Sequence, residues 1–103
     1  MKIIKELSEH IEEEIDGAEE YVKAAIKYKH DHPTLSKILY DMSMDEMHHM
    51  ELLHGEVVKL IEEYRKEKGS PPAPMQAVYD YLHEKHIQEA KEVRMYQAEY
   101  RGT

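Results

Sequence analysis

Apolar side chains recur along the chain at alternating spacings of three and four, the period that places residues on one face of an α-helix. Three such stripes can be traced, and each is interrupted by only a few polar positions. The first comprises Ile4, Leu7, Ile11, Glu14, Ala18, Tyr21, Ala25 and Tyr28, the second Leu35, Leu39, Met42, Glu46, His49, Leu53, Val57, Leu60 and Tyr64, and the third Val78, Leu82, His86, Glu89, Val93, Tyr96 and Tyr100. The pattern predicts three amphipathic helices and no strand.

The breaks between the stripes locate the ends of these helices. Pro33 follows a short polar run and suits the opening turn of a helix, whereas Gly69 ends a helix ahead of a proline-rich connector. The predicted helices span about 2–30, 33–68 and 74–101. Because 103 residues are enough for one core, we expect a single all-α domain over 1–103.

The second predicted helix also carries a second apolar face, made of Tyr40, Met44, Met47, Met50, His54, Val58 and Ile61. A two-helix hairpin cannot bury both faces of one helix. We therefore expect the second face to meet the third helix or another subunit, and oligomerisation is the economical solution for so short a chain.

Three polar residues interrupt the first two stripes: Glu14 in the first, and Glu46 and His49 in the second. A charged side chain in an apolar stripe is costly unless it is paired or bound to a metal. In an antiparallel hairpin about Pro33, position 14 lies 19 residues before the turn and position 46 lies 13 after it. At about 1.5 Å per residue the mismatch is roughly 9 Å, which turn residues that do not advance along the axis reduce. We therefore expect the three side chains at about one level.

The composition limits the available chemistry. Cysteine is absent, which excludes disulfides, iron–sulfur ligation and thiolate zinc sites, so any metal must be held by carboxylate and imidazole groups, which suit iron, manganese or zinc. The formal net charge of -8 argues against nucleic-acid binding. No apolar run reaches the roughly 18 residues of a membrane span, and the opening MKIIKELSEH lacks a signal-peptide core. We expect a cytoplasmic protein.

The spacing Glu-x-x-His is a weak signal by itself, because about one such pair is expected by chance in a chain rich in both residues. Two occur, Glu46/His49 and Glu51/His54. Glu51 lies about 200° around the helix from His49, so the second pair predicts a surface or interface position. A Glu on one helix with a Glu-x-x-His on another is the half-site of a carboxylate-bridged di-iron centre. The alternative is a buried, hydrogen-bonded Glu–His pair that sets helix register.

The segment from Glu14 through Tyr21 to the run Asp45-Glu46-Met47-His48-His49 resembles the ferritin-like superfamily, most closely the rubrerythrins and the encapsulated ferritins. In these families a ligand Glu is followed by a Tyr seven residues on, and by Glu-x-x-His about thirty residues beyond the first Glu. The run Pro33-Thr34-Leu35-Ser36-Lys37-Ile38-Leu39 is also similar to the encapsulated ferritins. The resemblance covers roughly 4–65.

The resemblance implies a di-iron centre with Glu14, Glu46 and His49 as its ligands. Glu46 or its counterpart would bridge the two ions, His49 would be a terminal ligand, and Tyr21 would be a hydrogen-bonding residue beside the site. The implied activity is that of a ferroxidase, which oxidises Fe(II) with dioxygen or peroxide in iron handling or oxidative-stress defence, with manganese or zinc as substitute metals. The alternative function is a non-enzymatic helical interaction or structural module with a structural Glu–His cluster or a static metal.

A rubrerythrin-type domain has four helices and a second Glu-x-x-His, whereas three helices are predicted here. The encapsulated ferritins are half-sized and complete the di-iron site across a subunit interface. The resemblance therefore implies at least a homodimer, in which an antiparallel hairpin from each chain contributes to a four-helix-bundle-type core. The stretch Tyr100-Arg101-Gly102-Thr103 does not match their shell-targeting tail, so a shell-protein partner is unsupported.

The third helix offers two further candidate metal ligands, His86 and Glu89. Glu89 precedes Tyr96 by seven residues, as Glu14 precedes Tyr21, which is consistent with a second half-repeat and an intrachain ligand set. The alternative is a polar pair at a partly exposed helix edge. We expect the run Glu12-Glu13 to be solvated and the remaining histidines to lie at the surface, namely His10, His30, His32, His48, His54 and His83.

Overall fold

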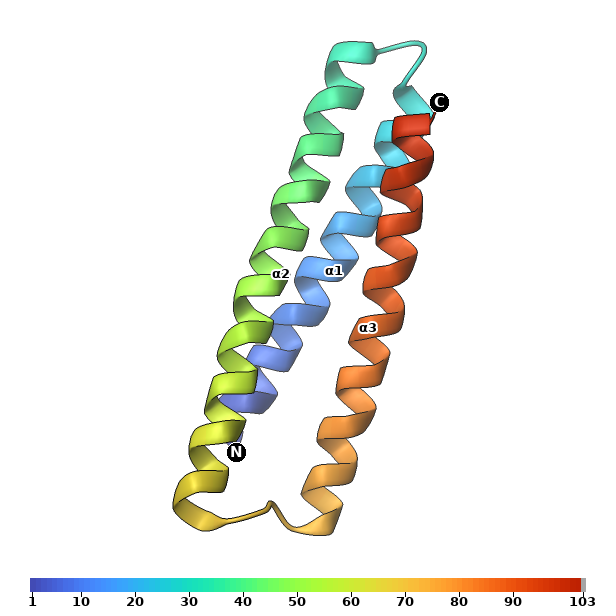
Figure 1. Ribbon diagram of the computed structural model, residues 1–103. Coiled ribbons are helices and arrows are strands. Elements are labelled where there is room, and N and C mark those ends of the chain that lie inside the picture. The colour runs from blue at the N-terminus through green and yellow to red at the C-terminus, as the bar shows by residue number, and fades with distance from the viewer. Residues whose placement is uncertain (103) are drawn as a thin grey trace.

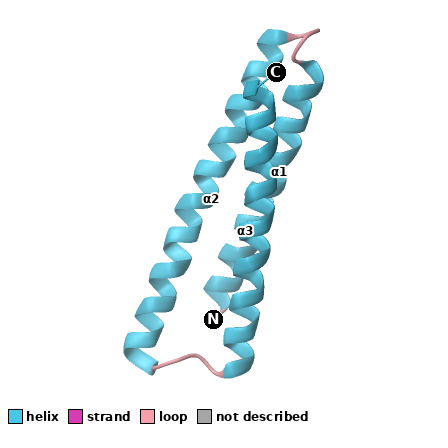
Figure 2. Cartoon of the chain, turned by 45° about the vertical axis from the view of Figure 1, so that its right-hand side comes forward, coloured by secondary structure: helices cyan, strands magenta, loops and turns pink. Residues whose placement is uncertain are grey.

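The computed structural model describes residues 1–102, and within that range the chain forms three long helices and no strand. The helices are α1 (Lys2–Tyr28), α2 (Pro33–Lys68) and α3 (Ala73–Gly102). Successive helices are antiparallel and their connections lie at opposite ends of a bundle 56 Å long and 17–18 Å across (Figures 1 and 2). The prediction of an all-α chain with three helices is confirmed. No helix within residues 1–102 is long and apolar enough to cross a membrane.

The helix ends follow from local chemistry. Pro33 occupies the first position of α2, where its missing N–H removes no hydrogen bond. Gly69 closes α2 at φ 78°, a left-handed conformation that a side chain disfavours. The first helix ends at Tyr28, two residues before the expected position, because residues 29–31 already form the turn.

The core is built around α1, which packs against both other helices, whereas α2 and α3 touch one another only sparsely. One cluster of buried side chains joins all three helices: Ile11, Ile15, Ala18, Met47, Met50, Ala90 and Val93. Burial of this apolar surface is the main force that holds the helices together, at about 25 cal/mol per Å².

Two buried serines set the register between α1 and α2. Ser43 Oγ donates a hydrogen bond to the Ala18 carbonyl oxygen at 2.7 Å, and Ser36 Oγ donates one to the Ala25 carbonyl oxygen. Both bonds belong to the same antiparallel register, which, continued by one turn, brings position 14 level with Met47. The hairpin is thus centred near residues 30–31 rather than at Pro33, and the mismatch estimated from sequence disappears.

These serines correct the predicted apolar stripe of α2. Ser36 and Ser43 are fully buried, while Leu35 and Met42, which were expected in the core, are 45% and 37% exposed. Small side chains let α1 and α2 approach closely, and their hydroxyl groups are satisfied by carbonyl oxygens of α1, so burial costs little. The buried face of α2 is therefore rotated away from the stripe predicted by hydrophobicity alone.

Similar corrections apply to the other helices. On α1 the buried face includes Ser8, Ile15 and Val22, which were outside the predicted stripe. On α3, Val78 is 54% exposed, whereas Gln97 is buried and donates from Nε2 to Ser43 Oγ at 3.0 Å. Ser43 thereby connects all three helices through hydrogen bonds.

We expect the change Ser43→Ala to destabilise the fold by about 1–3 kcal/mol, because it removes a bond to Ala18 and leaves the buried Gln97 amide without its partner. Urea unfolding followed by circular dichroism measures the loss. Ser70→Ala, in the exposed connector between α2 and α3, is the matched control and should leave stability unchanged. Equal stability of the Ser43 and Ser70 variants would contradict the role assigned to Ser43.

Candidate metal centre

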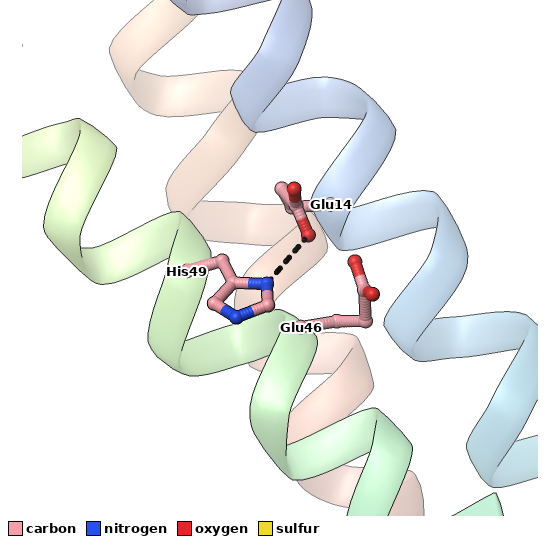
Figure 3. A group of neighbouring side chains, drawn as sticks. All are labelled: Glu14, Glu46 and His49. Atoms are coloured by element: carbon pink, nitrogen blue, oxygen red, sulfur yellow. Dashed lines mark ion pairs between the residues drawn. The ribbon is translucent and has the colours of Figure 1, made fainter.

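The three polar residues singled out in the sequence come together in the structure. Glu14 projects from α1 toward Glu46 and His49 on α2, as Figure 3 shows. Each offers one ligand atom, and these atoms all lie within 4.8 Å of one another. His49 Nδ1 is 3.4 Å from Glu14 Oε2. The cluster thus contains two carboxylates and one imidazole.

The positions of these side chains follow from the serine register and the helix period. Position 14 is level with Met47, so the side chain of Glu14 reaches α2 between Glu46 and His49. Positions i and i+3 share a helix face, which places Glu46 and His49 on the same side of α2. Gly17, one turn beyond Glu14, lies beside Glu46: a Cβ there would be 3.5 Å from Glu46 Oε2, an ordinary van der Waals contact.

The cluster lies at the edge of the α1–α2 interface rather than in the core, contrary to the burial expected from the stripes. The side chain of Glu14 is 26% exposed and that of His49 is 52% exposed. The charged groups therefore keep part of their hydration, which reduces the cost of burying charge. One side of the cluster remains accessible to solvent, small molecules or another chain.

The two carboxylates are close enough to share a proton. A hydrogen bond to Glu14, partial burial and the negative charge of Glu14 raise the pKa of Glu46 from 4.5 to about 7, against a lowering by His49. Glu14 Oε2 is buried and has no hydrogen-bond partner among residues 1–102. Two carboxylates in contact repel unless a proton or a cation lies between them. A divalent cation would satisfy both groups and the imidazole, and this mixed oxygen and nitrogen set suits Fe²⁺, Mn²⁺ or Zn²⁺.

The candidate metal centre lies on the flank of α1 that faces away from α3. Glu12, about 200° around the helix from Glu14, faces α3, where its carboxylate pairs with Lys85 and His86. In Figure 3 the ribbon of α3 passes behind the α1–α2 pair, on the far side from the three side chains. No residue of α3 within the described chain belongs to the Glu14 cluster.

His86 and Glu89, the further candidates from the third helix, join a different group. Glu89 lies with Glu12 and Asp16, again with ligand atoms within 4.8 Å of one another. His86 is buried and its Nε2 is 3.2 Å from Glu12 Oε2. Lys85 Nζ, at 3.1 Å from Glu12 and 3.6 Å from Glu89, supplies positive charge to this group. The ammonium group of Lys85 thus reduces the repulsion between these carboxylates, as a bound cation would.

The pKa values of the second group reflect its crowding. Burial, followed by Glu12, raises the pKa of Glu89, and burial lowers the pKa of His86 so that its neutral form is favoured. Glu12 was expected on a solvated face, and Asp16 was not singled out in the sequence. The sequence gives one sign of their role: Glu12 and Asp16 are spaced by four, as His86 and Glu89 are spaced by three. Neither spacing shows which helices face each other.

Tyr21 lies two turns beyond Glu14 on the same flank of α1 and is half-buried. Among residues 1–102 it makes no hydrogen bond to Glu14, Glu46 or His49. The hydrogen-bonding role that the resemblance implies for Tyr21 stays a prediction.

No protein-family model, no curated protein sequence and no solved structure matches this chain. The chemistry of the candidate metal centre therefore rests on its donor atoms and their surroundings.

The raised pKa of Glu46 predicts how the stability of the metal-free protein depends on pH. Because the folded state holds this proton more tightly than the unfolded state, ionisation of Glu46 destabilises the fold as pH rises from about 4.5 through 7. Glu46→Gln cannot ionise, so at pH 8 it should be more stable than the parent by on the order of 2 kcal/mol, with no difference at pH 4.5.

Urea unfolding in the presence of a chelator at both pH values measures this difference. Glu63→Gln, at an exposed position further along α2, is the matched control and should follow the parent protein. An unchanged pH dependence in Glu46→Gln would show that Glu46 and Glu14 do not share a proton.

Proposed function

We propose that the protein is a ferritin-like di-iron carboxylate protein that oxidises Fe(II), with each chain supplying half of the metal centre. The observation that carries this proposal is the convergence of Glu14, Glu46 and His49, whose ligand atoms all lie within 4.8 Å of one another on an accessible flank of the helix pair. One Glu from one helix and a Glu-x-x-His from the next are the half-set of ligands used by carboxylate-bridged di-iron proteins. Iron is the substrate of the proposed reaction, and manganese or zinc fit the same donors.

The chain's own groups have defined tasks in this proposal. Glu14 and His49 hold a ferrous ion, and Glu46 loses its shared proton to become a second carboxylate ligand, which offsets the positive charge of the ion. Each Fe(II) gives up one electron, so two ions with two protons reduce hydrogen peroxide to water, and four ions with four protons reduce dioxygen to water.

A second copy of the chain is the proposed partner at this flank. The cluster has three ligands and leaves a side open, whereas a paired centre needs ligands on both sides. On α1 the open flank has alternating spacings of four and three, the repeat of a helix–helix seam. It comprises Ile3, Leu7, His10, Glu14, Gly17, Tyr21, Ala24 and Tyr28, none of which is fully buried in the single chain.

The same flank of α2 carries apolar side chains that one chain does not cover. Leu35, Ile38, Met42 and Leu52 are all exposed, Leu52 to 59%, and they lie on both sides of His49 along the helix. Exposed apolar residues arranged as a stripe indicate an interface, while scattered ones do not. Pairing two such flanks would form a four-helix core from two α1–α2 hairpins and bring two half-sites together.

The enzymatic part of the proposal is tested with Glu46→Ala. This variant should lose Fe(II)-dependent oxygen uptake and weaken metal binding more than about 100-fold, because one carboxylate ligand is removed, while helicity is retained. Glu63→Ala is the control and should behave as the parent protein. If Glu46→Ala still bound two irons per dimer and oxidised them, the assignment of the site would be wrong.

The assembly is tested by placing charge on the exposed stripe. Met42→Asp combined with Leu52→Asp should convert the dimer to a monomer in sedimentation velocity, since two carboxylates would be buried in the interface. Met95→Asp, on the 72% exposed Met95 of α3, should leave the dimer intact. A parent protein that sediments as a monomer would contradict the proposed assembly.

A second candidate function is a non-enzymatic module in which the cluster is structural. The observation in its favour is the contact of His49 Nδ1 with Glu14 Oε2, which pairs the two groups without a metal. Purification from iron-supplemented cells separates the candidates. About one iron per chain with oxygen uptake supports the ferroxidase, and metal-free protein whose melting is unaffected by Fe(II) supports the module.

A further inference from the structure

A cavity of about 310 Å³ lies between the three helices in the half of the bundle near the chain's first residues. It lies where α1 packs against both other helices, while the backbones of α2 and α3 approach one another at few positions. Ile4 and Ile11 of α1 and Val57 of α2 contribute its apolar wall. Three histidines line the same cavity: His54 from α2, and His83 and His86 from α3.

Two of these histidines face one another across the gap between α2 and α3. His54 Nε2 is 3.3 Å from His83 Nδ1, and the ring centroids are 5.2 Å apart with planes inclined by 21°. The rings are stacked with an offset, and a nitrogen of each ring lies at hydrogen-bonding distance from a nitrogen of the other. Both residues were expected at the surface, yet His54 is half-buried.

This separation matches the spacing of two ligands on one metal ion. Two imidazole nitrogens bound to a tetrahedral ion at about 2.0–2.1 Å lie roughly 3.3–3.4 Å apart. In the metal-free protein one ring must donate to the other, so the second nitrogen's lone pair is already directed into the gap. Small side-chain rotations suffice to direct both lone pairs at one ion.

We propose that His54 and His83 form a second binding site, independent of the Glu14 centre, for a borderline divalent transition-metal ion such as Zn²⁺. Borderline ions favour imidazole nitrogen, whereas Mg²⁺ and Ca²⁺ favour oxygen ligands. His86 lines the same cavity, but Glu12 engages its Nε2, so the protein supplies two ligands and solvent completes the coordination.

The electrostatic surroundings suit such an ion. Metal ligation requires neutral imidazole, and burial together with His83 lowers the pKa of His54. Glu62 and Asp80 also line the cavity and supply negative charge, against the single positive charge of Arg65. The ion would therefore enter a cavity whose lining carries more negative than positive charge.

Occupation of this site would fasten α3 to α2. The backbones of the two helices approach each other at few points, so two metal–ligand bonds at His54 and His83 would add to the side-chain hydrogen bonds that join them, such as those of Ser43 with Gln97 and Glu51 with Arg94. An ion that binds the folded chain only, at a free concentration of about 100 times its Kd, raises the ratio of folded to unfolded protein about 100-fold.

The test uses Glu46→Ala as the parent, so that the Glu14 centre does not contribute. Calorimetric titration of this variant with Zn²⁺ should show about one ion per chain, and its melting temperature should rise on adding Zn²⁺. Adding His54→Asn or His83→Asn should weaken Zn²⁺ binding at least tenfold and abolish the rise in melting temperature. His48→Asn, at an exposed position on α2, is the matched control and should change neither.

Amide hydrogen exchange supplies a readout of the connection itself. In Glu46→Ala, Zn²⁺ should slow amide exchange in the segment of α3 around His83. Adding His54→Asn should abolish this protection, although His54 belongs to α2, because the ion would no longer join the two helices. Failure of Glu46→Ala to bind Zn²⁺, or undiminished binding after His54→Asn, would overturn the proposal. Either result leaves the ferroxidase proposal unaffected, because that centre is disabled in every protein compared.

Discussion

The hydrogen bonds from Ser36 and Ser43 to carbonyl oxygens of α1 determine how α1 and α2 are aligned along their axes. Apolar packing alone is tolerant of such alignment, because one layer of aliphatic side chains resembles the next. A buried hydroxyl tolerates no such shift, since leaving it without a partner costs about 1–3 kcal/mol. The register that satisfies both serines is also the one that places Glu14 between Glu46 and His49. The geometry of the candidate metal centre therefore depends on two serines that are not members of the Glu14, Glu46 and His49 cluster.

The central position of α1 explains why the molecule has two carboxylate clusters. One flank of α1 faces α2 and carries Glu14, and the opposite flank faces α3 and carries Glu12 and Asp16. Between them, the face of α1 that includes Ile11 and Ile15 is fully buried. The acidic groups are thus kept at the edges of the core, where partial hydration lowers the cost of charge. On the α3 side Lys85 offsets part of the negative charge, and on the α2 side His49 lies against Glu14.

The two clusters differ in the positive charge that the chain supplies to them. Lys85 offsets part of the negative charge of Glu12 and Glu89, and burial together with Glu12 still raises the pKa of Glu89. At the Glu14–Glu46 pair, Glu14 and partial burial raise the pKa of Glu46 to about 7, against the lowering by His49, so that a cation can take the place of the proton on Glu46. The apolar stripe that continues beyond His49 on α2 connects this chemistry to assembly, because covering the stripe also encloses the accessible side of the cluster.

Periodicity, breakers and composition were sufficient to determine the three helices, their ends to within about two residues, and the residues Glu14, Glu46 and His49 as a group. These features are local: they depend on spacing within one helix and on Pro33 and Gly69 between helices. The tertiary structure decided which face of each helix is buried. In α2 the core contains Ser36 and Ser43, whereas Leu35 and Met42, which were expected there, are exposed. It also decided that Glu89 meets Glu12 and that His54 meets His83. Such contacts depend on how one helix is rotated and aligned against another. Hydrogen bonds between residues distant in sequence, such as those of Ser36 and Ser43, determine this alignment, and the spacing of residues along the chain does not reveal it.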